Sequence, residues 1–557
     1  MQSVKSYFNK GVVRKDILRF SPVWGFYSLM LAMMLLIPAL NQQNIPWILA
    51  RAINFLAPIN LVYGLVCALA LFGDLYRPRH CNALHAMPLR REGWFFSHVT
   101  SGLLFSLVPS LIFCAIAACT GDGGVYVAGW WLLASTLSFL CFFGMAVFCA
   151  LCAGNALAAV MLYGMLNVLA GLLSLMLEGM LSPLLPGVVL DIDFLYYLIP
   201  LLTMSAAQYL GYESSINGYL LVLKDGWGYL AVCALVGLAL LGLALLFYRK
   251  RKLERAGDFL AVGWLRPVFL VVFSLFAGTL GFLVQILFFR EDTVASWVLF
   301  AVGLAAGFFL GKMFLHHRVQ VFQRRSWVQL AALGAVVAAC LLAVYFDPMG
   351  IVTYIPPVEE VRSVYLEVGY GDGDAAVVTN PSDITIVEAL HEEILPSARE
   401  KQTANTFRVK LTYDLGSRTV QRSYYLPERH YGSQSQFLKQ LQGVLTRNGQ
   451  LFQGGYTQKE ALERLDSLRI NNTDIPQKLL PGLLLAMEAD LQEGTLLQNR
   501  MFHDDNCGCS YTMEWIFDRE DVDGKSYSTY YYRQIFECCT NTIAWIQAHP
   551  ELHISSY

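Results

Sequence analysis

Long apolar runs recur through the first two-thirds of the chain and limit the folds open to it. Each run holds about 20 residues or more with few charges, the length that an α-helix needs to cross a bilayer. Of all residues, 56% are hydrophobic and only 15% are charged, which exceeds what a soluble domain requires. We predict nine spanning helices, at roughly Pro22–Leu40, Phe55–Gly73, Val99–Ala118, Tyr126–Cys152, Asn155–Leu181, Trp227–Phe247, Trp264–Phe288, Ala295–Phe314 and Trp327–Phe346.

The charges between the runs predict how the chain is oriented. Short loops rich in Lys and Arg stay on the cytoplasmic side of a membrane, and here every second loop is basic. The basic lead Met1–Phe20 suits a surface helix on the inner leaflet, which places the N-terminus in the cytoplasm. Nine spans then place everything after Phe346 outside the cell. The inner loops contain Arg77, Arg79, Arg90, Arg91, then Arg249, Lys250, Arg251, Lys252, Arg255, then Lys312, Arg318, Arg324, Arg325.

From Asp347 onward the pattern becomes that of a soluble α+β domain. Residues 363–368 alternate like a strand, and 407–413 with 420–426 read as a β-hairpin. Helices are expected from Ser382 and over Gln434–Leu445, Lys459–Leu468 and Pro476–Leu491. The predicted fold class is a polytopic α-helical membrane protein with a C-terminal extracytoplasmic α+β domain. The transmembrane domain covers 1–346, with the inner loop 74–98, and the extracytoplasmic domain covers 347–557.

The first inner loop, Asp74–His98, is basic and contains histidines. Pro78 is suited to open a short helix, with Cys81, Leu84 and Met87 on one face until Pro88 ends it. A short helix held at the membrane surface between two spans can transmit movement. It can equally be a topological anchor with snorkelling arginines, and the spacing alone leaves both interpretations open.

Several motifs are absent or incomplete. The phosphate-binding pattern GxxxxGK[ST] is missing, since the nearest approach has Met313 in the Ser/Thr place, so any ATP is expected on another chain. His391-Glu-Glu begins like a zinc-protease motif, but Leu395 stands where the second His is needed, which indicates a surface helix. The net charge of −2 gives no reason to expect a nucleic-acid partner.

Two further groups of residues invite a chemical interpretation. Four C-terminal cysteines could form one or two disulfides, bind a metal together with His503, or remain thiols; because neither CxC nor CC is a zinc spacing, we predict no metal site. Polar residues within the spans could line a substrate path or form hydrogen bonds between helices. The cysteines are Cys507, Cys509, Cys538 and Cys539, and the candidate path residues are Asn60, Asn167, Glu178 and Gln285.

The chain resembles the ABC-2 type transporter permease subunits of Gram-positive bacteria. KDILRFSPVWGFYSLML and LYRPRHCNALHAMPLRREGWFFSHVTSGLL are similar to the family's first span and first inner loop, with Met87-Pro88 in its Leu-Pro place. FYRKRKLERAGDFLAVGWLRPVF resembles the second inner loop. The segment from Val358 to about Gln453, with AWIQAHPEL at the end, is similar to an uncharacterised C-terminal domain on one branch of these permeases.

The resemblance implies a multi-pass cell-membrane permease subunit that performs no chemistry and holds no cofactor. It would pair with an identical or sister permease and bind a cytoplasmic ABC ATPase carrying ATP and Mg, to export an amphipathic or cell-envelope-active compound. The alternative is an extracellular ligand sensor anchored in the membrane without transport activity, although no inner loop is long enough to fold as an output domain. The implied ATPase contacts are Arg77, Arg79, His80, Leu84, His85, Pro88, Arg90 and Arg91, with a second contact at Arg251, Glu254 and Gly257.

Overall fold

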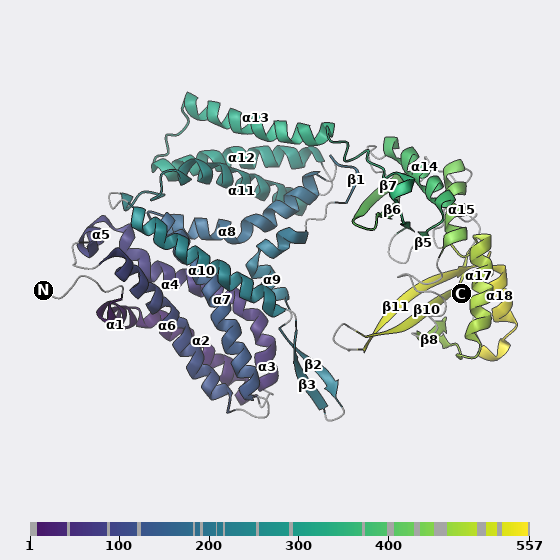
Figure 1. The fold of residues 1–557 in the computed structure, drawn as a ribbon, viewed down its shortest axis with the longest axis horizontal. Coiled ribbons are helices and arrows are strands. Elements are labelled where there is room, and N and C mark those ends of the chain that lie inside the picture. The colour runs from purple at the N-terminus through teal and green to yellow at the C-terminus, as the bar shows by residue number, and fades with distance from the viewer. Residues whose placement is uncertain are drawn as a thin grey trace. The chain divides into compact units, whose positions relative to one another are not determined.

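The chain folds into two compact units in a computed structural model (Figure 1). The first, the helical unit, comprises Met1–Met180 and Asp191–Ala339; the second, the C-terminal unit, comprises Leu181–Leu190 and Cys340–Tyr557. The structure describes residues 8–41, 45–85, 90–119, 124–181, 184–189, 193–207, 209–215, 218–224, 226–251, 255–288, 293–369, 374–397, 406–427, 435–449, 465–497, 508–520 and 526–554.

All nine predicted apolar runs are helical. Within the described residues, eight helices are long and apolar enough to cross a membrane, and a ninth candidate arises if α1 and α2, bent by 64°, count as one span. The long helices are α1 (Lys10–Arg19), α2 (Ser21–Leu40), α4 (Leu56–Phe72), α6 (Arg91–Ala117), α7 (Gly124–Cys152), α8 (Ala156–Met176), α10 (Gly226–Lys250), α11 (Leu265–Phe288), α12 (Thr293–His316) and α13 (Arg324–Phe346).

Shorter elements connect these helices. An apolar patch in the connection between α8 and α10 forms two of them, η4 and α9. The connecting elements are α3 (Ile45–Ala52), η1 (Ile53–Phe55), η2 (Gly73–Tyr76), α5 (Pro78–His85), the π-helical turn η3 (Leu177–Leu181), η4 (Asp193–Leu198), α9 (Pro200–Ala206) and the hairpin β2 (Leu210–Ser215) with β3 (Gly218–Leu223).

Close helix contacts in the helical unit depend on glycine. Gly144 of α7 faces Gly237 of α10, and a Cβ atom at Gly144 would lie 2.3 Å from the Gly237 carbonyl oxygen. Gly303 of α12 likewise packs on α11, where an added Cβ would lie 2.4 Å from the Ala277 oxygen. Small residues let backbones approach in this way where apolar burial cannot drive association, as in lipid. The helix pairs α7–α10 and α11–α12 therefore pack backbone against backbone at these glycines.

The last long helix, α13, packs along one narrow seam. Its Trp327 ring lies 4.8 Å from that of Phe309 in α12, and Leu330 and Leu333 contact the α11–α12 pair. No residue in the most apolar stretch of α13 is buried. In each of the other spanning-length helices described, a third or more of the corresponding stretch is buried. The remaining apolar surface of α13 is suited to lipid contact.

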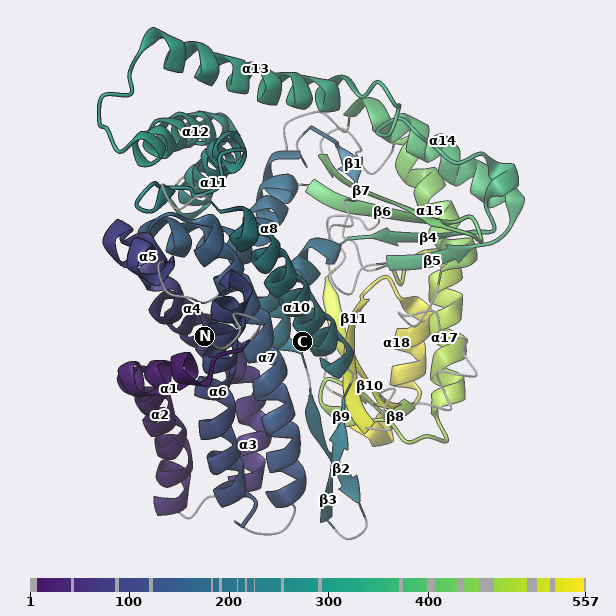
Figure 2. The same cartoon turned by 60° about the vertical axis from the view of Figure 1, so that its left-hand side comes forward.

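The C-terminal unit begins with a five-stranded antiparallel sheet in the order β1-β7-β6-β4-β5. Inward positions alternate along β4 and β6 and pack against α14 and α15 in one core (Figure 2). β4, β6, β7, α14 and α15 were predicted from the sequence, but β5 was not. Their bounds are β1 (Gly187–Val188), η6 (Val358–Glu360), β4 (Ser363–Val368), β5 (Asp374–Val378), α14 (Pro381–Ser397), β6 (Thr406–Asp414), β7 (Thr419–Pro427) and α15 (Gln436–Asn448).

A second antiparallel sheet, ordered β11-β10-β8-β9, corrects one expectation. The predicted helix Lys459–Leu468 is wrong at its C-terminal end, because Leu465–Ile470 forms strand β8; residues 451–464 lie outside the described part. The cysteine-bearing tail, for which no structure was predicted, contains a long hairpin. The elements are β8, β9 (Thr473–Asp474), α17 (Leu480–Glu493), β10 (Cys509–Glu520), β11 (Ser526–Phe536), α18 (Thr540–Gln547) and η9 (Pro550–Leu552).

Strand β1 comes from the connection between α8 and α10, yet it belongs to the C-terminal unit. Gly187 pairs with Ser423 and Val188 with Arg422 of β7. Gly187 has φ +78°, and a Cβ there would lie 1.9 Å from the Tyr424 ring, so only glycine fits. The expected domain boundary at residue 346 therefore omits a segment that the sheet recruits from the preceding domain.

Candidate functional site

The short helix predicted in the first inner loop is present as α5, and Asp74 ties it to its neighbours. An Asp74 carboxylate oxygen lies 2.7 Å from Arg19 Nη1 at the end of α1, and the other lies 3.2 Å from His80 Nδ1 in α5. The Arg19 and His80 side chains are roughly half exposed, so each pair contributes at most about 1 kcal/mol. These contacts position α5 without fixing it rigidly.

The side chains at the start of α5 differ in exposure. Cys81 is buried, whereas Arg79 and His80, and Arg77 just before the helix, are exposed. Cys81 therefore anchors the start of the helix, while Arg77 and Arg79 are accessible to solvent. Leu84 and His85 belong to α5 by backbone, their side chains are not described, and Pro88 lies outside the described residues.

Arg91, the first residue of α6, joins the first inner loop to the second. Its Nη1 donates hydrogen bonds to the carbonyl oxygens of Arg249 (3.1 Å) and Arg251 (3.0 Å), where α10 ends. Carbonyls at a helix C-terminus lack partners within the helix and carry the negative end of its dipole, so a guanidinium suits them. Glu92 lies 3.1 Å from Arg249 Nε. The two implied contact loops thus form one junction.

Arg251 lies inside this junction. It is only 5% exposed, and it donates to the Leu151 oxygen at the end of α7 (3.1 Å) and to the Leu75 oxygen in η2 (3.4 Å). In the described part of the chain no carboxylate pairs with it. Arg251 therefore clamps the ends of α7, η2 and α10, which leaves it unavailable as a surface contact.

The second inner loop is also hydrogen-bonded to the turn between α7 and α8. The Gly257 amide donates to the Gly154 oxygen, and the Gly154 amide donates to the Phe259 oxygen, both at 3.0 Å. Gly257 has φ +96°, a conformation that favours glycine. Of the three implied second-loop residues, Arg251 and Gly257 are structural here, and Glu254 lies outside the described residues.

Helix α1 docks on α6 through a polar contact that the sequence interpretation missed. Asp16 Oδ2 lies 2.7 Å from His98 Nδ1 and accepts a hydrogen bond of 2.9 Å from Ser101 Oγ, and the side chains of Asp16 and His98 are nearly buried. The Trp94 ring lies 3.9 Å from the His98 ring. A detectable signal existed, because Asp16 is the only acidic residue in the basic lead.

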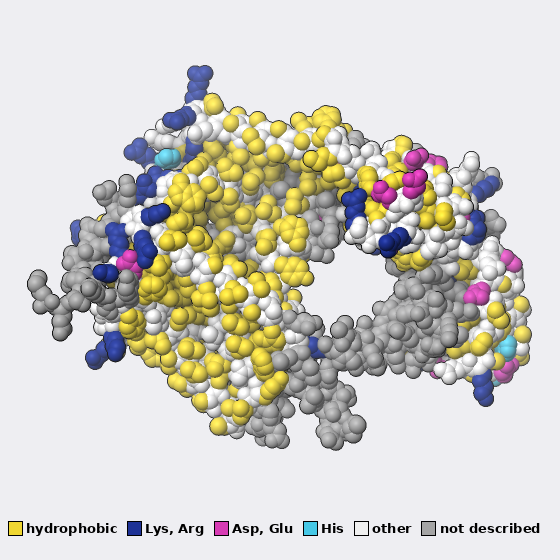
Figure 3. All heavy atoms as spheres, in the orientation of Figure 1, with side chains coloured by type: hydrophobic (Ala, Val, Ile, Leu, Met, Phe, Trp, Pro, Cys, Tyr) yellow, Lys and Arg dark blue, Asp and Glu magenta, His cyan; other side chains and the backbone are white. Residues whose placement is uncertain are grey.

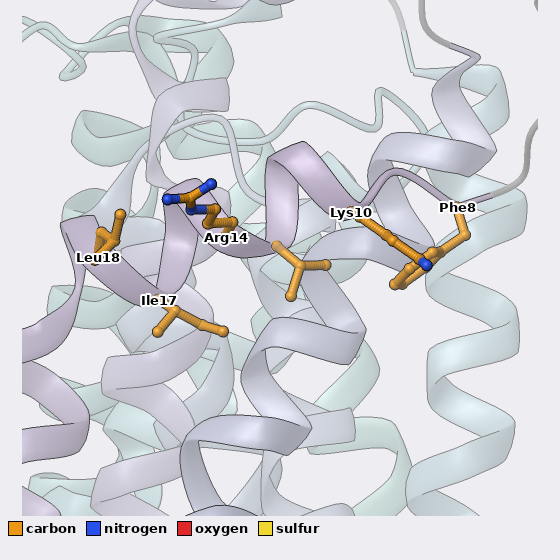
Figure 4. Close-up of a pocket in the computed structure, with 6 residues that line it drawn as sticks. Phe8, Lys10, Arg14, Ile17 and Leu18 are labelled. Atoms are coloured by element: carbon orange, nitrogen blue, oxygen red, sulfur yellow. The ribbon is translucent and has the colours of Figure 1, made fainter.

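The outer face of α1 remains open. A pocket of about 260 Å³ runs along it, lined by Phe8, Lys10, Val13, Arg14, Ile17 and Leu18 (Figure 4). Apolar side chains flanked by cations are typical of a helix lying in a lipid interface.

A second pocket lies at the α6–α10 junction. It measures about 530 Å³ and is lined by Arg90, Arg91, Glu92 and Arg249. Lys and Arg side chains of the helical unit gather at the end where α1 and α5 lie, and apolar surface covers the flank beside it (Figure 3). The inner loops predicted from charge alone therefore meet at one end of the unit.

The candidate path residues do not come together around either pocket. Asn60 is buried and donates to the Ser135 oxygen of α7 (3.3 Å), while Asn167 donates to the Tyr163 oxygen of its own helix (2.9 Å). Gln285 is buried and Glu178 is exposed in η3. The hydrogen bond from Asn60 joins two helices, as the alternative interpretation expected for such residues.

The C-terminal unit contains a buried histidine where a surface helix was expected. His391 of α14 is fully buried, with Nδ1 2.9 Å from the Tyr413 hydroxyl and Nε2 2.7 Å from the Tyr424 hydroxyl. Burial, reinforced by the positive charge of Arg422, lowers the pKa of His391 to about 4. The residue is therefore a neutral part of the core.

The four C-terminal cysteines differ in state. Cys538 is in a disulfide, whereas Cys509 and Cys539 are thiols, and Cys507 lies outside the described residues. Cys539 is fully buried and donates to the Thr495 oxygen at 3.1 Å; burial raises the pKa of its thiol to about 12. Among the described residues, no three His, Cys, Asp or Glu side chains gather as a metal site.

Comparison with known proteins finds no match. No protein-family model fits the chain, and no curated protein or solved structure is significantly similar to it.

Proposed function

We propose that the chain is the membrane-spanning permease subunit of an ATP-driven transporter of the ABC-2 type. It is a multi-pass protein of the cell membrane, with its N-terminus in the cytoplasm and its C-terminal unit outside. A separate ABC ATPase subunit holds ATP and Mg, and a second permease, identical or a sister chain, completes the complex. The transported compound is amphipathic or active on the cell envelope, and it is exported.

The arrangement of α5 is the observation that carries this proposal. Arg77, just before α5, and Arg79, within it, are exposed, while Asp74 links the start of the helix to α1. Its neighbour η2 is clamped by Arg251 to the ends of α7 and α10. A partner that pushes α5 therefore acts on four other elements at once.

Linkage sets the energetic condition for such coupling. A transporter changes state only if its partner and its cargo bind the two states with different free energies. The exposed Asp74 pairs are weak enough for an ATPase to break and remake, whereas the buried Arg251 clamp is not. Movement of α5 then passes to α7 and α10, whose Gly144–Gly237 contact makes them move as a pair.

The test is co-purification from native membranes in mild detergent. Wild type is compared with the double variant Arg77→Glu plus Arg79→Glu, which reverses the exposed charges of α5. The control Arg318→Glu plus Arg325→Glu makes the same charge change at exposed positions of the same basic end. We expect a P-loop ATPase to co-purify with wild type and the control, and to be lost from the α5 variant. An absence of any ATPase from folded wild type would contradict the proposal.

One observation favours the sensor alternative as a second candidate. Both chain segments that enter the C-terminal unit converge on β7: β1 pairs there, and Arg422 donates to the oxygens of Ile351 (2.7 Å) and Tyr354 (3.0 Å) in the segment after α13. A ligand that altered β7 would act on α8 and α13 together. A chain that binds ligand outside the cell and recruits no ATPase would fit this function.

A further inference from the structure

The geometry points to a binding site for the phosphate of an anionic membrane lipid in the pocket at the α6–α10 junction. The pocket is lined by Arg90, Arg91, Glu92 and Arg249, and it has a volume of about 530 Å³. This inference is independent of the ATPase partner, because the lipid would bind the chain alone.

The charges in the pocket do not balance. Glu92 is the only acid among the four lining residues, and it pairs with Arg249 at 3.1 Å. Arg91 uses its Nη1 on backbone carbonyls, which carry no net charge, and no carboxylate of the described residues pairs with it. Arg251, just behind, adds another cation that donates to carbonyls and has no carboxylate partner among the described residues. Arg91 and Arg251 therefore give the site positive charge that an anion would neutralise.

The position of the pocket favours a lipid over a soluble anion. It lies where α6 begins and α10 ends, at the boundary of two spanning-length helices. Within about one turn, Phe96 of α6 and Leu246 of α10 are 41% and 49% exposed. Trp264 is 62% exposed, and its ring lies 6.2 Å from that of Phe247, near the end of α10. Exposed Trp side chains near the end of a spanning helix are typical of the membrane–water interface. A headgroup phosphate in the pocket would thus have its acyl chains beside exposed apolar surface.

Arginine suits this ligand chemically. Its planar guanidinium donates paired hydrogen bonds to phosphate oxygens, and Glu92 holds Arg249 in place for that role. A bound phosphate would in turn fix the end of α10 against the start of α6.

The experiment is native mass spectrometry of the full chain in detergent, titrated separately with phosphatidylglycerol, phosphatidylcholine and inorganic phosphate. The variants are Arg249→Gln, the charge-preserving Arg249→Lys, and the control Arg318→Gln, which removes an exposed charge at the same basic end. A cation near an anionic lipid contributes about a fivefold change in affinity. We expect phosphatidylglycerol to bind at least tenfold more tightly than phosphatidylcholine, with a loss of about fivefold in Arg249→Gln.

Arg318→Gln is expected to stay within twofold of wild type. Arg249→Lys keeps the charge but loses the paired donors, so its loss should be smaller than that of Arg249→Gln, and a thermal melt of each variant checks folding. Equal losses in Arg249→Gln and Arg318→Gln would overturn the site in favour of diffuse attraction. Displacement of phosphatidylglycerol by millimolar inorganic phosphate would overturn the lipid assignment in favour of a soluble anion. Equal binding of the two lipids would overturn both.

Discussion

Acidification should weaken the C-terminal unit through its buried histidine. His391 lies between the hydroxyls of Tyr413 and Tyr424, and burial, with the charge of Arg422, lowers its pKa to about 4 from 6.5. In the unfolded chain it titrates near 6.5. Between these values the unfolded state binds a proton that the folded state does not. The free energy of unfolding therefore falls as pH falls from 6.5 to 4, and the effect levels off below 4.

The size of the effect follows from the two pKa values. Each pH unit between them is worth about 1.4 kcal/mol, so the full window amounts to about 3 kcal/mol. Glu388 acts in the opposite direction, because burial and the nearby Glu392 raise the pKa of its carboxyl. A variant that changes only the histidine keeps this background and isolates the contribution of His391.

The assay is hydrogen exchange of β6 and β7 peptides in the full-length protein, corrected for intrinsic rates, from pH 6.5 to 4. His391→Leu leaves two buried hydroxyls without their partner, which lowers the free energy of unfolding by about 2–4 kcal/mol. The variant should also lose the part of the slope of this free energy against pH that comes from one titrating proton. Tyr424→Phe lowers stability but keeps the titrating ring and its slope. The same pH slope in wild type and His391→Leu would refute the reasoning.

Two further substitutions test the clamp and the recruited strand. Arg251→Met removes the donor for buried carbonyls at the ends of α7 and η2 and should cost about 2–4 kcal/mol, seen as a lower melting midpoint in detergent, whereas Arg318→Met should leave the midpoint unchanged. Gly187→Val places a side chain on the Tyr424 ring and should release β1, raising amide exchange in β7 while leaving β8 and β10 unaffected. Unchanged exchange in β7 would count against the pairing.

Hydropathy predicted the long helices well because a single physical requirement, burial of about 20 apolar residues, produces them. Loop charge alone also anticipated that the inner loops lie at one end of the helical unit. The charge pattern could not predict which group each charged side chain contacts. Arg91 and Arg251 read as surface cations in the sequence, yet they bind helix-terminal carbonyls, and backbone acceptors leave no trace in a sequence.

The C-terminal unit was predictable only where strands alternate. β4, β6 and β7 show period-two burial, whereas β8 is short enough to fit a helix or a strand, and tertiary pairing with β10 decides it. The missing second ligand after His391 predicts a surface helix, but the tyrosines that contact this histidine come from β6 and β7, 22 and 33 residues further along the chain. The pairing of β1 with β7 joins positions more than 200 residues apart, which no local pattern can report.

The most direct test of the proposed function is photocrosslinking from α5 in native membranes. A benzophenone amino acid is placed at exposed position 79, and at buried position 81 as the control. The account predicts an ATP-sensitive adduct between position 79 and a P-loop ATPase, with none from position 81. No adduct from position 79 in folded protein, or equal adducts from both positions, would contradict the claim that this helix couples the chain to an ATPase.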